Sequence, residues 1–227
     1  MSPSVVDEYV GGRNEKNERH GVGIWKHADG RQYAGGWRNG KRHGEGTMQY
    51  ADESSYTGGF ADGLRDGDGK FVSAKGGFVY EGGWKSGLMH GHGKMVGNIA
   101  TLAPAGWQVK TSDAGVAHLP VSYEGQFTEG KLTGRGRITY GVGEAASSSA
   151  DSSAANLLNQ WQYEGDLVNG QRHGQGTLGD SRGNIIYSGG WNADDCHGFG
   201  ELYHRDGRLS YRRPWRRSRR RGRRNEG

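Results

Sequence analysis

A thiol and an imidazole stand side by side at Cys196 and His197, the two groups that a cysteine nucleophile and its base would supply. On a β-strand, however, neighbouring side chains point to opposite faces of the sheet, so this base would not reach this thiol. No third residue is evident that would orient the imidazole. We therefore assign no catalytic residue to this pair.

Histidine also recurs once in each of several sequence repeats, at His43, His90, His173 and His197. Zinc requires all of its ligand atoms about 2.1 Å from one ion. If the repeats are hairpins lying side by side, equivalent residues of neighbouring repeats lie about 10 Å apart, because strands are spaced about 4.8 Å. We interpret these histidines as turn residues and expect no metal site.

Two segments mimic a phosphate-binding loop, at residues 35–41 and 125–131. That motif requires Ser or Thr after the lysine, to hold Mg²⁺, and a loop between a strand and a helix. Arg42 and Leu132 stand at this place instead, and the repeat described below predicts strands on both sides. We interpret both segments as hairpin turns, and we expect no cofactor and no small-molecule substrate.

The composition excludes several classes of protein. The 227 residues include 44 Gly and four Pro without a Gly at every third position, which rules out collagen. Seven Trp and 11 Tyr are interleaved with the glycines, unlike the composition of a flexible linker. One cysteine cannot build a disulfide framework or a thiolate cluster. With no apolar stretch typical of a membrane span or a signal peptide, we expect a soluble intracellular protein.

One pattern dominates the chain: Tyr-x-Gly-x-Trp or Phe, a short turn, and then Gly-x-Gly with an apolar residue two positions on. Copies begin 23 or 24 residues apart, except across two longer intervals. They start near Tyr9, Tyr33, Tyr56, Tyr80, Tyr123, Tyr163 and Tyr187. The first copy has one extra residue, and Asp66, Leu167 and Asp194 replace the usual His, aromatic residue and Gly. A fixed period of this kind indicates a repeat architecture.

The pattern of each copy predicts a β-hairpin. Residues i, i+2 and i+4 of a strand share one face, so the Tyr, Gly and aromatic residue point the same way. A turn such as Asn39-Gly40 follows, and a second strand then places its glycines beneath the aromatic rings. That strand ends in an apolar residue: Trp25, Met48, Phe71, Met95, Ile138, Leu178 or Leu202. Because an isolated hairpin is marginally stable, we expect the copies to stack into one sheet.

The pattern Tyr-x-Gly-x-Trp/Phe-x-x-Gly-x-x-x-Gly-x-Gly resembles the MORN repeat (membrane occupation and recognition nexus) over about residues 9–211, apart from two insertions. The resemblance implies an all-β fold, an elongated single-layer antiparallel sheet of tandem hairpins. The expected structural spine comprises Tyr33, Gly35, Trp37, Gly44, Gly46, Tyr56, Gly58, Phe60, Gly67, Gly69, Tyr80, Gly82, Trp84, Gly91, Gly93, Tyr123, Gly125, Phe127, Gly134, Gly136, Tyr163, Gly165, Gly174, Gly176, Tyr187, Gly189, Trp191, Gly198 and Gly200.

The chain divides into a repeat array, residues 1–211, and an Arg-rich tail, residues 212–227. Insertions interrupt the array at about residues 97–121 and 141–160. The first carries apolar residues, and we expect an ordered loop that packs on the sheet. The second is rich in Ser, Ala and Gly, and we expect disorder. The array is net acidic once the tail is set aside, so the basic charge marks the tail as an interaction segment.

These observations predict a non-catalytic structural scaffold or spacer that binds other proteins through its sheet, because no segment remains for an enzyme domain. Similarity to stand-alone MORN arrays implies a cytoskeletal assembly, most closely the axoneme of a cilium or flagellum, with its radial spokes and central apparatus. The alternative is a peripheral membrane adaptor that the tail recruits to anionic phospholipid.

The tail is also expected to bind acidic protein segments. RNA is a weaker candidate, because the tail carries no evident platform on which bases would stack. The arginines expected to contact an acidic partner are Arg212, Arg213, Arg216, Arg217, Arg219, Arg220, Arg221, Arg223 and Arg224.

Overall fold

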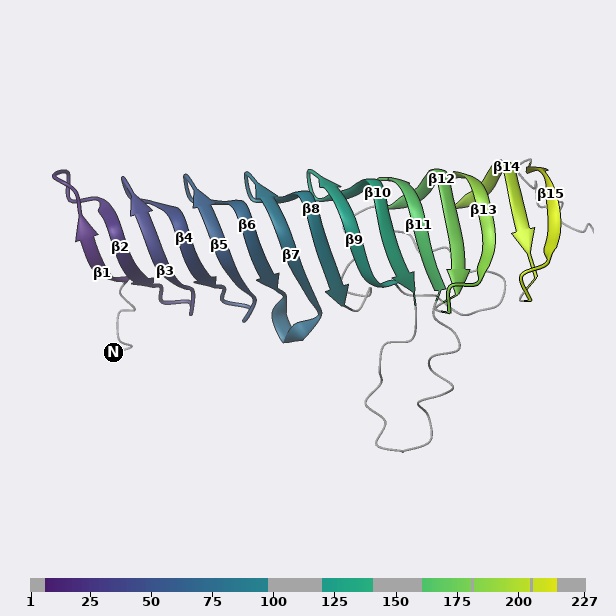
Figure 1. The fold of residues 1–227 in the computed structure, drawn as a ribbon. Coiled ribbons are helices and arrows are strands. Elements are labelled where there is room, and N and C mark those ends of the chain that lie inside the picture. The colour runs from purple at the N-terminus through teal and green to yellow at the C-terminus, as the bar shows by residue number, and fades with distance from the viewer. Residues whose placement is uncertain (1–6, 98–119, 141–160, 181, 205, 216–227) are drawn as a thin grey trace, which may run out of the picture.

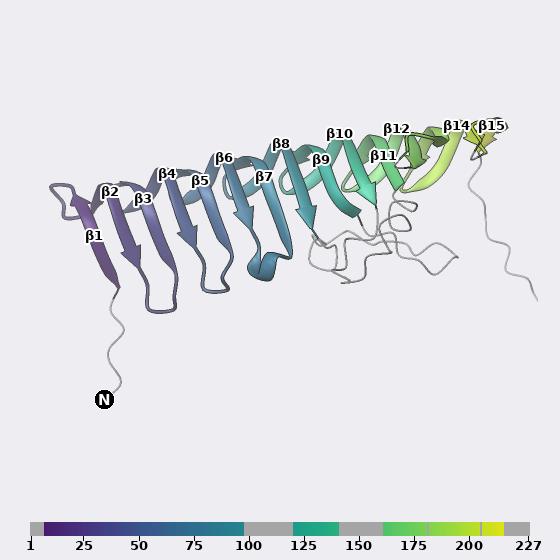
Figure 2. The same ribbon diagram turned by 60° about the horizontal axis from the view of Figure 1, so that its bottom comes forward.

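The chain forms one antiparallel sheet of 15 strands whose order in space equals their order in the sequence, as the computed structural model shows (Figure 1). The structure describes residues 7–97, 120–140, 161–180, 182–204 and 206–215. The strands are β1 (Glu8–Arg13), β2 (Arg19–Lys26), β3 (Gln32–Arg38), β4 (Lys41–Gln49), β5 (Ser55–Ala61), β6 (Leu64–Val72), β7 (Phe78–Lys85), β8 (Leu88–Gly97), β9 (Pro120–Thr128), β10 (Lys131–Tyr140), β11 (Trp161–Val168), β12 (Gln171–Asp180), β13 (Ile185–Asn192), β14 (Asp195–Tyr203) and β15 (Leu209–Trp215). One turn of 3₁₀ helix, Ala74–Gly76, connects β6 to β7. The predicted fold class, an elongated single layer of tandem hairpins, is confirmed (Figure 2).

Within a hairpin, the register brings the repeat residues together. Tyr33 on β3 lies opposite Met48 on β4, and Gly35 lies opposite Gly46. Beyond this point the register shifts, and the single residue Gly36 stands opposite three residues of β4. The excess residues form a β-bulge, which bends the hairpin. The same shift recurs in the other hairpins, as between Gly58 and Phe60 of β5.

From the repeat at Tyr33 onward the hairpin turns have two residues, both with positive φ, whereas β1 and β2 are joined by residues 14–18. Asn39 and Gly40 have φ values of 49° and 81°, and the other short turns repeat this geometry. Such turns match the twist of the flanking strands, and they need residues that tolerate the left-handed region. The expectation of hairpin turns at residues 35–41 and 125–131 is therefore confirmed, and the phosphate-loop context of a following helix is absent at both.

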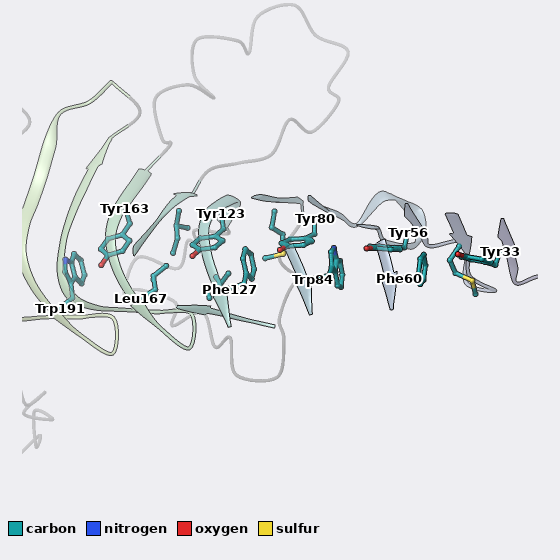
Figure 3. Packing of buried hydrophobic residues seen from close by; sticks show 14 of the residues in the cluster. Tyr33, Tyr56, Phe60, Tyr80, Trp84, Tyr123, Phe127, Tyr163, Leu167 and Trp191 are labelled. Carbon is teal, nitrogen blue, oxygen red and sulfur yellow. The ribbon is translucent and has the colours of Figure 1, made fainter. Parts of the chain in front are cut away.

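The core is a spine of aromatic rings on one face, the inner face (Figure 3). Tyrosines of six repeats are at most 2% exposed. The aromatic residue at i+4 inserts between the tyrosine of its own repeat and that of the preceding one: the ring centroid of Trp37 lies 5.1 Å from that of Tyr33 and 5.4 Å from that of Tyr9. The pairs meet edge to face, the arrangement that ring quadrupoles favour.

The second-strand apolar residues complete this core as predicted. Met48, Met95 and Ile138 are 1–3% exposed, and the remaining four pack against the cluster while partly buried. Leu167, which replaces an aromatic residue, is 1% exposed and fills the same place in the row (Figure 3). An aliphatic side chain therefore preserves the continuity of the core at this position.

The structure moves the boundary of the tail. Strand β15 continues to Trp215, so Arg212 and Arg213 belong to the sheet and not to the tail. The run of basic residues that begins at Arg212 does not mark the end of the sheet. The guanidinium of Arg212 pairs with Glu201 on the neighbouring strand, Nε to Oε1 at 2.6 Å. Residues 216–227, and the expected loop and disorder within residues 98–119 and 141–160, lie outside the described residues.

Replacing Trp84 with Ala tests the spine. Its ring, 6% exposed, contacts Tyr56 and Tyr80, and its Nε1 donates a hydrogen bond to the Gly69 carbonyl at 3.2 Å. Removing it should cost about 3 to 5 kcal/mol of unfolding free energy in denaturant titrations. Leu88→Ala, at a half-exposed side chain on the same hairpin, is the control and should change stability little. Equal, small losses for both variants would contradict a stacked spine.

Candidate binding surfaces of the sheet

Each repeat tyrosine is fixed at both ends of its ring. The hydroxyl of Tyr33 donates to the carbonyl oxygen of Gly36 at 2.9 Å, and Tyr56 and Tyr80 make the same bond to the residue three positions on. The bond recurs in all seven repeats, with acceptors Gly12, Gly36, Gly59, Gly83, Gln126, Asp166 and Gly190. The hydroxyl therefore satisfies a carbonyl beside the bulge while the ring stays in the core.

The predicted contact between ring and glycine is also present. A Cβ added to Gly46 would lie 2.6 Å from Cε2 and Cζ of Tyr33, closer than any real side chain tolerates. The other repeats show the same obstruction, for example at Gly69 beneath Tyr56. The second glycine of the pair on each second strand is therefore needed for space, because the ring takes the place of a side chain. The first glycine has open space in the example of Gly44, whose φ of 72° lies in the left-handed region that favours Gly.

Neighbouring repeats are joined at the turns. The backbone N–H of Gly63 donates to the Arg42 carbonyl at 2.9 Å, and that of Gly87 donates to the Arg65 carbonyl at 2.8 Å. The side chain at this arginine position then covers the aromatic ring of the next repeat: the guanidinium of Arg65 lies 4.0 Å from the centroid of Trp84. Burial lowers the pKa of Arg65. Cation–π contact and the turn bonds together couple one repeat to the next.

The departure at Asp194 is compensated locally. Asp194 has a φ of 71° where other repeats have Gly, and its carboxylate Oδ1 accepts hydrogen bonds from the backbone N and the Nε of Arg172. The same guanidinium lies 4.2 Å from the centroid of Trp191. A partly buried ion pair therefore accompanies a residue that tolerates the left-handed region less readily than Gly.

The candidate chemical groups do not form a reactive site. Cys196 packs partly buried against the core, and burial raises the pKa of its thiol, which disfavours a thiolate nucleophile. The histidines lie not in the turns, as we interpreted them, but on the second strands: His43, His90 and His197 are in the bulges, and His173 pairs with Asp166 beside one. Among the described residues, no three His, Cys, Asp or Glu side chains are grouped to hold a metal ion.

The outer face carries an exposed surface that the sequence reasoning missed. The residue after each repeat tyrosine lies directly opposite its counterparts on both neighbouring strands, which gives one continuous line that we call the outer row. It comprises Val10, Ile24, Ala34, Thr47, Thr57, Lys70, Glu81, Lys94, Glu124, Arg137, Glu164, Thr177, Ser188, Glu201 and Arg212. Comparing the repeats position by position would have found it.

The charge along the outer row changes with position. From β6 to β11 basic and acidic residues alternate, with ion pairs of 3.9 Å between Lys70 Nζ and Glu81 Oε2 and of 2.9 Å between Arg137 Nη2 and Glu164 Oε2. From β1 to β5 the row is uncharged. A polar hollow of about 170 Å³ lies beside the charged part, lined among others by Arg135, Glu164, Asp166, Gln175, Thr177 and Ser188. The outer face therefore offers surfaces of different polarity along one rigid layer.

The fold and these surfaces are those of a repeat protein with an extended binding surface. The MORN repeat model matches residues 33–55, 56–78, 80–98, 123–144, 163–185 and 187–207. The chain belongs to the MORN-repeat family, whose repeat is a non-catalytic unit that binds proteins or membrane lipids. No curated protein matches the chain. The hairpin at Tyr9 lies before the matched segments, yet Tyr9 pairs with Trp25 and Gly11 with Gly23 in the register of the other repeats.

Of the predicted tail contacts, Arg212 forms the ion pair with Glu201, and the arginines from Arg216 onward lie outside the described residues. No helix in the part of the chain that the structure describes has the length and hydrophobicity of a membrane span.

Alkaline pH should unfold the array. Burial raises the pKa of Tyr33, Tyr56 and Tyr187 to about 12, and that of the other buried repeat tyrosines in the same direction. A tyrosine in the unfolded chain ionises near pH 10. The contribution of these tyrosines to stability should therefore be fully present below about pH 10 and fall as the pH rises toward 12, because the unfolded chain then binds fewer protons than the folded chain. Denaturant unfolding at each pH, with phenolate absorbance recorded in parallel, measures this; spine tyrosines that ionise near pH 10 without loss of structure would contradict it.

Proposed function

We propose that the protein is a non-catalytic scaffold and spacer that binds other proteins of an assembly along its outer face. The observation that carries the proposal is the outer row, a line of side chains that crosses the 15 strands of the described sheet without interruption. Its members are exposed from β1 to β11 and on β15, and half-buried at Thr177, Ser188 and Glu201. At about 4.8 Å per strand, the layer extends roughly 65 to 70 Å. One molecule therefore presents more than one contact region to its partners at fixed separation.

The polarity of the outer row changes along the sheet, which supports the binding of different partners at its centre and at its β1 end. Its charged centre suits a partner with alternating charges of its own, since misplaced like charges are costly at an interface. Its uncharged end at β1 to β5 suits contacts through shape and apolar area. A family of binding repeats without a catalytic residue is consistent with both roles.

The particular assembly is a proposal that rests on resemblance to stand-alone MORN arrays. We propose a cytoskeletal assembly, and within it the axoneme of a cilium or flagellum. A second candidate, a peripheral membrane adaptor, is favoured by one observation: residues 216–224 contain seven arginines, which would attract anionic phospholipid at about 1 kcal/mol each near the surface.

Proximity labelling in cells, with three variants of the tagged chain, separates these functions. Glu81→Lys with Glu124→Lys breaks the alternation of the outer row and should remove most labelled neighbours. Glu15→Lys with Glu53→Lys makes the same charge change at exposed loop residues and should leave the neighbours unchanged. Truncation after Trp215 removes the tail, and the scaffold should keep its location.

The adaptor function predicts the opposite pattern. The truncated chain would become diffuse, and the full chain would sediment with phosphatidylserine vesicles but not with neutral ones. That result, together with unchanged labelling by the outer-row variant, would contradict the scaffold proposal. Circular dichroism of each purified variant confirms that the sheet is intact before the comparison is made.

A further inference from the structure

The two ends of the sheet present different edges. Strand β15 contains Arg212, Arg213 and Pro214, and charge and proline at an edge strand disfavour the addition of further strands. Strand β1, with sequence EYVGGR, has no proline and no charge between its first and last residues. Within the described residues β1 pairs with β2 alone. The edge of β1 is therefore open to another strand.

The outer side of this edge is apolar. Val10 on β1 is 64% exposed, and Val22 and Ile24 on β2 are 79% and 49% exposed. Val10 and Ile24 lie directly opposite each other, and Ala34 on β3 continues the row. β-branched residues on neighbouring strands form a flat surface that favours strand addition.

The inner side of the edge is closed to a further MORN repeat. Arg13 occupies the place of the i+4 aromatic residue, pairing with Arg19 as Trp37 pairs with Arg42. Its guanidinium lies 5.2 Å from the centroid of Tyr9 and ends the spine. A preceding repeat would need an aromatic residue here to contact its tyrosine. A terminal repeat with a polar cap is typical of repeat arrays, so the edge suits a different strand.

We propose that two copies of this chain pair through β1, antiparallel and related by a two-fold axis at Val10. Val10 then lies opposite Val10 of the second copy, and the outer row runs on as Ala34, Ile24, Val10, Val10, Ile24 and Ala34. Gly11 lies opposite Tyr9 of the second copy, so that glycine again faces tyrosine. Asp7 of each copy lies opposite Arg13 of the other, which gives two symmetry-related ion pairs.

The neighbouring registers that keep the same faces together are worse matched. A shift of one pairing step toward the start of the strand places Val10 opposite Glu8 and Tyr9 opposite Tyr9. A shift the other way places Tyr9 opposite Arg13 and Glu8 opposite Asn14. Only the register centred on Val10 pairs opposite charges and keeps the apolar row continuous. Residues 7–53 carry eight basic and eight acidic residues, so the two ends do not repel each other.

A disulfide tests both the dimer and its register. In a Cys196→Ser background, Val10→Cys should cross-link to dimer under mild oxidation, because opposed residues of antiparallel strands have Cα atoms about 4.5 to 5.5 Å apart, within disulfide range. Ile24→Cys is the matched control: the two copies of Ile24 would lie three strand spacings apart, about 14 Å, and should not cross-link. Failure of Val10→Cys to cross-link, or equal cross-linking of both variants, would overturn the proposal.

Charge exchange gives a second test on the full chain. Asp7→Arg and Arg13→Asp each place like charges opposite one another, so each variant alone should sediment as a monomer where the unmodified protein sediments as a dimer. An equimolar mixture restores both opposite pairs and should form heterodimers. A monomeric unmodified protein at all concentrations, or a mixture no more dimeric than its components, would rule out pairing through β1.

Discussion

The fit of one tyrosine ring over glycine backbone is the constraint on which the rest of the molecule depends. A single-layer sheet has no second layer to bury its apolar side chains, and each repeat solves this by laying Tyr33 or its equivalent across a position that has no side chain. The hydroxyl is satisfied by a carbonyl three residues on, so the ring is buried without leaving a polar group unpaired. Gly46 and its equivalents are therefore required by space.

That fit also determines how the repeats assemble. Because the i+4 aromatic residue contacts the tyrosines of two repeats, a hairpin alone completes only half of its core. Arg65 over Trp84, and the turn bond from Gly87 to the Arg65 carbonyl, strengthen the same junction. Each interface between neighbouring repeats then adds to the stability of the array, and Arg13 ends the aromatic spine at β1. The inner face is thereby committed to folding, which leaves the outer face to distinguish this chain from others of its family.

The sequence predicted the hairpins, their turns and the ring-over-glycine contact, because each follows from side-chain alternation and from the conformational freedom of Gly. It did not predict the bulge, since two residues of excess on β4 are visible only once Gly36 is seen opposite three residues. For the same reason His43 was wrongly placed in a turn. Arg212 was wrongly placed in the tail because local charge gave no sign of its cross-strand partner Glu201. The sequence analysis missed the outer row because its residues share a position in the repeat but differ in residue type.

The central claim is that the Tyr33 ring, and not the local backbone, requires glycine at position 46. A double-mutant cycle with Gly46→Ala and Tyr33→Ala measures this directly by denaturant unfolding. Gly40→Ala, at a turn glycine with positive φ and open space, gives the cost of a backbone effect alone. The account predicts that Gly46→Ala is costly in the unmodified protein, more so than Gly40→Ala, and nearly neutral once the ring is removed. Equal costs of Gly46→Ala with and without the Tyr33 ring would contradict it.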